Sequence, residues 1–206
     1  TVAALAADNE LVCWAPRSGP GFVALEVTNN LVDYSDSHVL FEYVYASVVS
    51  IAPTNGPTTG GTTIVVRGDG FLSRTRYGTW CIFGRDVKSQ AIVLSATTVN
   101  CITPATTTPQ SVAVSLQISG VTTSGAISFH YMASNEITSV HPLIGPAAGG
   151  TIVVLEGKYF EAVSWCRFDG IVTPGRFVST ERIQCTTPAH AAGYVDVATT
   201  SNQVDY

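Results

Sequence analysis

Residues 49–71 read VSIAPTNGPTTGGTTIVVRGDGF, and residues 138–160 read TSVHPLIGPAAGGTIVVLEGKYF. The two stretches align without a gap at an offset of 89 residues and share their proline, Gly-Pro, Gly-Gly-Thr and final phenylalanine. Proline fixes φ and glycine accepts positive φ, so Gly-Pro followed by Gly-Gly predicts a tight reversal. The β-branched run after it predicts a buried strand. The chain is therefore an array of repeated β units.

A second match surrounds the cysteines. Residues 80–84 read WCIFG and residues 165–168 read WCRF, at an offset of 85. The loop before the later copy is thus four residues shorter. Together the matches predict the C-terminal part of one module at residues 1–45, a complete module at 46–132 and a second module at 133–206.

Composition favours strands over helices. Hydrophobic residues make up 46% of the 206 residues and charged residues 12%, and valine, isoleucine and alanine alternate with threonine and serine. No long segment carries an apolar stripe of helical period, whereas residues 112–118, VAVSLQI, alternate as a half-buried strand does. Several short strands between Gly/Pro turns indicate an all-β chain of immunoglobulin-like β-sandwiches.

The charge excludes one class of partner. The net charge is −5, and the ten basic residues are scattered along the chain. Because a nucleic-acid binder needs clustered lysine and arginine, we expect no nucleic acid. No apolar run reaches the ~20 residues that span a bilayer, so we expect no direct membrane insertion in this segment.

Four of the five cysteines fall into two pairs that follow the repeat. We pair Cys81 with Cys101 and Cys166 with Cys185, since other pairings would cross modules. Zinc is the alternative, but no Cys-x-x-Cys and no neighbouring histidine pair supports it. Disulfides imply an oxidising compartment, so we expect an extracellular or cell-surface protein of the secretory pathway.

Cys13 is the odd cysteine. Its surroundings, VCWAP, match NCITP at 100–104 and QCTTP at 184–188, each of which holds the second cysteine of a pair. Cys13 to Tyr43 spans 30 residues, as does Cys101 to Tyr131. We expect the partner of Cys13 to lie upstream of Thr1, in a longer array from which this chain is a stretch.

The combination of Pro, Gly-Pro, Gly-Gly-Thr, Gly-x-x-Phe, Cys-x-Phe-Gly and Cys-x-x-Pro over about 85 residues resembles the IPT/TIG domain. The resemblance covers essentially the whole chain. It implies early-set immunoglobulin-like sandwiches in an extracellular tandem array. The later copy departs from it at Phe168-Asp169-Gly170, where a changed turn is expected. The family's modules serve as stalks, adhesive surfaces and appendages of enzymes, so the resemblance alone does not fix a function.

Candidate contact residues adjoin the cysteines. If Cys81 and its neighbours two residues away face the core, an adjacent tryptophan faces outward. Such a side chain either contacts another chain or a glycan, or packs under a neighbouring loop. The three positions concerned are Trp14, Trp80 and Trp165.

Glycan attachment is a further candidate. The loop TPATTTP at 103–109 is of the Thr/Pro-rich kind that carries O-linked sugars, with Thr106, Thr107 and Thr108 as candidates and an unmodified loop as the alternative. No Asn-x-Ser/Thr sequon occurs.

Nothing in the sequence predicts catalysis. The four histidines stand outside any recognisable nucleophile motif, and the acidic residues lack the spacing of a calcium loop, with Asp33 and Asp36 a weak alternative. We therefore expect no catalytic residue, no metal and no cofactor.

The joins between modules, at residues 41–51 and 131–137, contain no glycine or proline and little charge. They predict buried contacts and a stiff array, whose partners are neighbouring modules and other protein chains, with glycans left open. The first functional interpretation is a structural or adhesive rod within a fibre, appendage or flagellar-hair-like glycoprotein filament. The alternatives are the stalk of a receptor or adhesion ectodomain, and an accessory module of a secreted carbohydrate-active enzyme.

Overall fold

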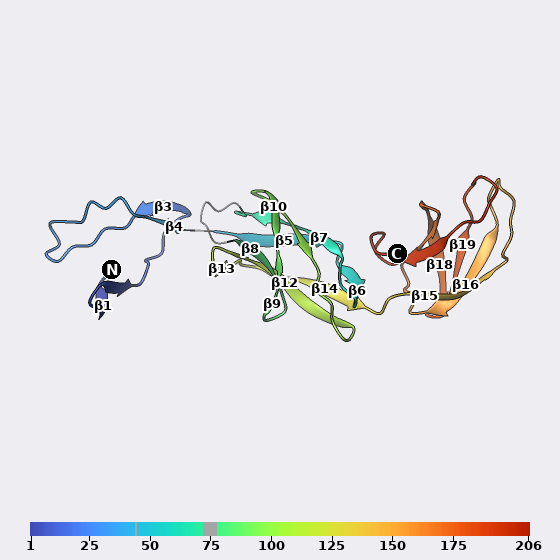
Figure 1. The fold of residues 1–206 in the computed structure, drawn as a ribbon, viewed down its shortest axis with the longest axis horizontal. Helices are drawn as coiled ribbons and strands as arrows, with labels where there is room; N and C mark the ends of the chain where they lie inside the picture. Colours follow the sequence, from blue (N-terminus) through green and yellow to red (C-terminus); the bar gives the residue numbers. More distant parts are fainter. Residues whose placement is uncertain (44, 72–77) are drawn as a thin grey trace. The chain divides into compact units, whose positions relative to one another are not determined.

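The computed structural model describes residues 1–43, 45–71 and 78–206. Val44, part of the first predicted join, lies outside the described residues. In these ranges every regular element is a β-strand, which confirms the predicted all-β class (Figure 1). No helix in the described parts has the length and apolar character needed to cross a membrane. The chain divides into two compact units, Thr1–Tyr45 and Ala46–Tyr206.

The first unit, termed here the N-terminal segment, holds two hairpins. Strand β1 (Ala3–Ala7) pairs with β2 (Glu10–Cys13), and β3 (Gly21–Ala24) pairs with β4 (Leu40–Tyr43), both antiparallel. The residues of these strands are mostly apolar, yet nearly all of them are exposed. These hairpins therefore have no core of their own.

Residues 46–132, termed the middle module, form two sheets. The first sheet has the order β10 (Ile92–Ser95), β11 (Thr98–Ile102), β7 (Thr63–Asp69), β5 (Ser47–Ala52). The second has the order β6 (Asn55–Pro57), β14 (Ile127–Met132), β12 (Gln110–Ile118), β8 (Thr79–Phe83), β9 (Val87–Gln90), with β13 (Val121–Thr122) on β12. All named pairs are antiparallel except β6 with β14.

The core of the middle module lies between these sheets. Inward positions alternate along each strand, as the sequence predicted for residues 112–118, where Val114, Leu116 and Ile118 are fully buried. The other side chains with no exposed surface come from both sheets and from the residues just before and after β7: Thr62, Ile64, Val66, Phe71, Cys81, Val99, Cys101 and Phe129.

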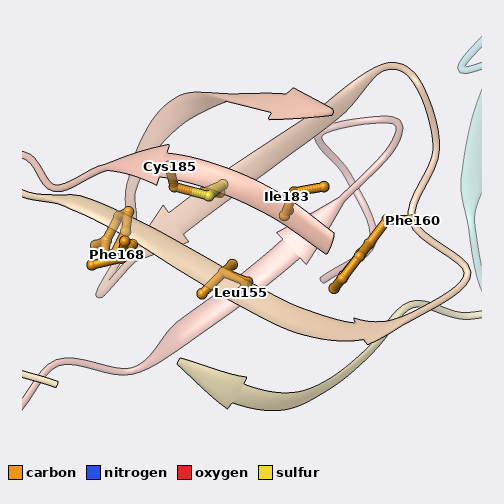
Figure 2. Close-up of a cluster of buried hydrophobic side chains, with 7 residues drawn as sticks. Leu155, Phe160, Phe168, Ile183 and Cys185 are labelled. Carbon is orange, nitrogen blue, oxygen red and sulfur yellow. A yellow bond between two sulfur atoms is a disulfide. The ribbon is translucent and has the colours of Figure 1, made fainter. Parts of the chain in front are cut away.

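Residues 133–206, termed the C-terminal module, form one continuous sheet path. Its order is β15 (Glu136–His141), β16 (Ile152–Lys158), β19 (Arg182–Thr186), β18 (Ile171–Ser179), β17 (Ser164–Phe168), β20 (Val197–Thr200). Strand β18 pairs with β17 up to Gly175 and with β19 from Gly175 onward, whereas the middle module divides the same path between β9 and β10. Figure 2 shows the core of this module, where Leu155, Phe160 and Ile183 belong to one buried cluster with the disulfide-bonded Cys185.

Glycine is needed at two repeated positions. Gly60 and Gly149 have φ of +71° and +76°, and a side chain there would collide with the backbone after Pro104 or Pro188. A side chain at Gly68 or Gly157 would overlap a backbone carbonyl of the neighbouring strand and the ring of the buried phenylalanine. The predicted turn is therefore present, and the glycines before the buried phenylalanines allow a close approach of two backbones.

The departure at residues 168–170 shortens a turn. Phe83 pairs with Val87, which leaves three residues between β8 and β9. Phe168 pairs with Ile171, so that only Asp169 and Gly170 remain, at φ of +45° and +92°. Two consecutive positive φ values suit a two-residue hairpin, and Asp-Gly is a preferred pair for it.

Candidate interaction surfaces

Two disulfides sit in the module cores. Cys81 on β8 is joined to Cys101 on β11, which links the two sheets of the middle module, with a Cα–Cα distance of 6.0 Å. Cys166 on β17 is joined to Cys185 on β19 at 6.2 Å. Both distances lie in the usual range for a disulfide. Cys13, on β2, is an exposed free cysteine in this chain.

The first candidate surface surrounds Trp80. Cys81 and Phe83 are buried, whereas the Trp80 side chain retains 41% of its exposure, so it faces outward as the alternation requires. Its register partners are Gln90 on β9 and Gln117 on β12, which share its face. The face thus combines one large flat aromatic group with two amides.

This outward face is only partly open to solvent. Ile82 keeps only 6% of its exposure although it lies two positions from Trp80, on the same outward face. Lys88, the register partner of Ile82, reaches along the face and donates from Nζ to Oε1 of Gln117 at 2.9 Å. The alternation of inward and outward residues along β8 did not predict that Ile82 is covered on the outward face.

The other two tryptophans have different settings. Trp165 is half-buried, with Pro174 on β18 and Thr200 on β20 as its register partners. Trp14 keeps 86% of its exposure in the N-terminal segment. Trp80 is therefore the tryptophan that a folded module presents most openly.

The second candidate site is a hydrogen-bonded turn within the compact unit Ala46–Tyr206. Thr62 Oγ1 in the middle module donates to Oδ2 of Asp205 at 2.8 Å. Asn202 Nδ2 donates to the carbonyl oxygen of Asn55 at 2.9 Å and to the same Asp205 oxygen at 2.7 Å. The carboxylate of Asp205 is thus shared by a donor from each module. We term these four residues the junction network.

The turn that carries Asp205 is held by its own backbone. Oδ1 of Asn202 accepts hydrogen bonds from the backbone N–H groups of Val204 and Asp205, each at 2.9 Å. Such a turn holds the carboxylate of Asp205 in position to accept the hydrogen bond from Thr62, which is fully buried. The sequence did not single out any residue of the junction network. The Asn-x-x-Asp motif at residues 202–205 indicates a turn but does not show which residue the turn contacts.

A hollow of about 170 Å³ lies beside the junction network, lined among others by Pro57, Met132, Asn135, Thr200 and Tyr206. Sites for small molecules occupy about 300–1,000 Å³. The hollow is smaller than such a site.

The Thr/Pro loop is accessible at its centre. Thr107 and Thr108 are exposed, and Thr106 is half-buried with its hydroxyl donating to the carbonyl of Thr108 at 2.9 Å. The backbone N–H of Thr106 donates to the carbonyl of Thr58 at 2.7 Å, which holds the loop against the middle module.

Two titratable groups have shifted pKa values. Burial raises the pKa of Tyr131 to about 12. The hydrogen bond from Arg182, at 2.6 Å, lowers the pKa of Glu156. Among the described residues no group of three or more His, Cys, Asp or Glu side chains could hold a metal.

The comparison with protein families decides what these modules are. The IPT/TIG domain model matches residues 46–131 and residues 136–205. The chain belongs to the IPT/TIG family. Both IPT/TIG modules therefore carry the same features at the same positions of the repeat. These features are the Gly-Pro and Gly-Gly turns, the glycine before the buried phenylalanine and the core disulfide.

The relatives of this IPT/TIG chain are large. Plexin-2 of Caenorhabditis briggsae and Plexin-2 of Caenorhabditis elegans are each 28% identical to it over 171 residues, which is 81% of this chain. The chain spans only 9% of the length of either relative. The solved extracellular region of plexin A4 matches with a TM-score of 0.51 and 18% identity, over 78% of this chain and 14% of that one. This last likeness shows the fold.

Proposed function

We propose that this chain is part of the stalk of a receptor or adhesion ectodomain, at the cell surface and without enzymatic activity. Its IPT/TIG modules would set the spacing and direction of a ligand-binding region elsewhere in the protein. The plexin relatives, one of them solved as an extracellular region, and the core disulfides support an extracellular stalk. They favour it over the filament rod, the first interpretation of the sequence, which no comparison supports.

The junction network is the observation that carries this proposal. A stalk transmits position only if successive modules keep their relative orientation. Asp205 accepts from Thr62 and from Asn202, and Asn202 also donates to Asn55, so the network adds non-covalent ties between the modules beside the covalent link.

Distance distributions between spin labels test the stalk. One label is placed on β10 by Leu94→Cys and one on β18 by Val178→Cys, both exposed positions, in a Cys13→Ser background. We expect one narrow distribution, which Asp205→Ala broadens. A broad distribution in the unaltered junction would show that the modules move independently, and the stalk proposal would then fail.

Sedimentation velocity distinguishes the stalk from the filament. A filament subunit self-associates as its concentration rises, whereas a stalk stays monomeric. The measurement is best made on the compact unit that begins at Ala46, since the exposed apolar residues of the N-terminal segment could associate on their own.

We also propose that residues 1–45 are the C-terminal part of a further IPT/TIG module. In β3 and β4, Val23 pairs with Phe41 and Gly21 with Tyr43. In the middle module, Val112 pairs with Phe129 and Gln110 with Tyr131. The same register on matching residues supports this assignment.

The Trp80 face is a candidate contact for another protein chain or a glycan, with Trp165 and Trp14 as weaker candidates. The open aromatic group and its flanking amides suit such a contact. Hydroxyl-radical footprinting of Trp80 in this chain and in a complete ectodomain tests the proposal. Equal oxidation in both would remove it.

A further inference from the structure

One turn occurs twice in this chain. Residues 28–34 read TNNLVDY and residues 200–206 read TSNQVDY, so that five of the seven positions are identical. The same offset of 172 residues places Cys13 on Cys185. The repeat therefore puts both turns at the same place in a module.

The two turns have the same internal hydrogen bonds. In the first turn Oδ1 of Asn30 accepts from two backbone N–H groups, at 3.0 and 2.9 Å, as Oδ1 of Asn202 does in the second. Nδ2 of Asn30 donates to Oδ2 of Asp33 at 2.8 Å, which matches the bond of 2.7 Å from Asn202 to Asp205. The residue after each asparagine has a φ of +62° or +61°. Identical residues thus hold the carboxylate of each turn in the same way.

The middle module reverses the chain at this place without such a turn. Residues 117–123 read QISGVTT there, with neither an asparagine nor an aspartate, and β12 passes into β13 through Gly120 at a φ of +85°. The fold therefore does not require the residues that the other two turns share, which indicates that these residues serve a contact.

The second turn is docked, whereas the first is open. In the junction network the second turn binds the hydroxyl of Thr62 and the carbonyl of Asn55, and its asparagine and aspartate are half-buried. Asn30 and Asp33 of the first turn are exposed, and in the described part of the chain they have no counterpart of these two bonds. The first turn thus offers one amide N–H and one carboxylate oxygen, already held in position, to a partner.

We propose that the turn at residues 28–34 binds the Gly-Gly-Thr loop of another IPT/TIG module. Asp33 accepts from the threonine hydroxyl, and Asn30 donates to the backbone carbonyl seven residues before that threonine, as the second turn does at Thr62 and Asn55. Since Thr62 is already bound by Asp205, the partner is a different loop. A turn that is ordered before binding loses little conformational entropy when it docks, which favours the contact.

A loop of the required kind stands open in the C-terminal module. Residues 149–151 repeat the Gly-Gly-Thr of residues 60–62, and Ile144 stands at the position of Asn55. Thr151 is partly exposed and Ile144 keeps 88% of its exposure, and among the described residues no turn of this type lies on them. Because the acceptor at this position is a backbone carbonyl, isoleucine serves as well as asparagine. A second molecule of this chain therefore supplies a probe for the first turn.

Nuclear magnetic resonance of the Asn30 side-chain amide tests the proposal on two forms of the full chain, both with Cys13→Ser. The labelled form carries Thr151→Val and keeps only the turn, and the unlabelled probe carries Asp33→Ala and keeps only the loop. Addition of the probe to about 1 mM should shift the Asn30 amide signals, since two hydrogen bonds support only weak binding. The matched control probe carries Thr151→Val as well, and it should reduce the shift at least about fivefold.

Two results would overturn the proposal. Unchanged Asn30 signals would show that the turn binds no such loop, and an equal shift with both probes would show that the threonine hydroxyl is not what it recognises. The inference rests on the junction network and not on the stalk function. It can therefore fail while the spin-label distances between the modules stay narrow.

An exchange of residues at the junction checks the turn in its known place. Ser201→Asn with Gln203→Leu gives the second turn the sequence of residues 28–34 in the full chain. We expect the Tm to stay within about 1 °C, whereas Asp205→Ala added to the same chain should lower it by about 3 °C. If the two exchanges alone lower the Tm as much as Asp205→Ala does, the sequence of the first turn is unfit to bind a Gly-Gly-Thr loop.

Discussion

The rings of Phe41 and Tyr43 meet edge to face, with centroids 5.0 Å apart and planes at 75°. Phe129 and Tyr131 repeat this arrangement at 5.0 Å and 76°. In the middle module the second pair is buried, whereas Phe41 keeps 40% of its exposure. Strand β4 therefore carries a pair of core side chains whose covering sheet is absent from the N-terminal segment.

Counting thiols tests the cysteine assignment. We predict one reactive thiol per folded chain and five after denaturation and reduction, because Cys13 is free and the other four cysteines are paired. Thiol titration and peptide mapping without reduction check both numbers. In a longer chain that includes the preceding half-module, the single thiol should disappear into a disulfide. A free Cys13 in that chain would contradict its proposed pairing.

Removing the middle disulfide measures its stabilisation. Cys81→Ala with Cys101→Ala should lower the free energy of unfolding by about 3 kcal/mol, since the bridge closes a loop of about 20 residues. Denaturant unfolding of the full chain provides the value. Cys13→Ser, at an exposed site, is the matched control and should change stability by less than about 0.5 kcal/mol. Equal effects of the two changes would contradict a structural disulfide.

The fold could be predicted because its signals are local. Gly60 and Gly149 precede apolar runs, and the requirement for positive φ at such turns shows in the residue type itself. The alternation in residues 112–118 likewise encodes which side chains enter the core. The disulfide pairing could also be predicted, because the repeat places two cysteines in the middle module and two in the C-terminal module.

The junction network could not be predicted in this way. Thr62 and Asp205 are 143 residues apart, and a single hydroxyl or carboxylate carries no periodicity that links it to a distant turn. The continuous β18 is a similar case, since it depends on the close approach of Gly175 to the carbonyl of Ser164. The junction network and the continuous β18 both depend on tertiary contacts between strands and turns that are far apart in the sequence.

O-glycosylation is predicted at the exposed centre of the Thr/Pro loop. When the chain passes through a secretory pathway, intact-mass analysis should show sugar additions at Thr107 or Thr108, which are exposed. The pair of changes Thr107→Ala and Thr108→Ala should remove them, whereas Thr63→Ala, at an exposed strand position, should not. A mass equal to that of the bare chain would end this prediction.

Alkaline pH should destabilise the middle module through Tyr131. Its pKa is raised from 10.0 to about 12 in the folded chain, mainly by burial. Between these values the unfolded chain loses the phenolic proton and the folded chain keeps it. The contribution of the protonated Tyr131 to the free energy of unfolding is therefore fully present below pH 10 and is lost as the pH rises toward 12.

Replacement of Tyr131 by phenylalanine isolates this effect. The Tyr131→Phe chain should lose less stability than the unaltered chain over the same pH range, as measured by urea unfolding at stepwise pH. Tyr159→Phe, at an exposed position, serves as the control and should leave the alkaline loss unchanged. Parallel curves for all three chains would show that Tyr131 does not drive the loss.

A double-mutant cycle on Thr62 and Asp205 measures the link between modules. Thr62→Val keeps the shape of the side chain and removes the donor to Asp205, at a cost of about 1 kcal/mol in unfolding free energy. Asp205→Ala removes the acceptor and also frees Asn202 Nδ2 from one of its two bonds. Because the two residues contact each other, the combined loss should be smaller than the sum of the single losses. Thr63→Val, one residue along β7 and exposed, controls for the added methyl group and should show no coupling to Asp205→Ala. Additive losses for Thr62 and Asp205, within the error of the unfolding measurement, would mean that this bond does not join the modules in solution.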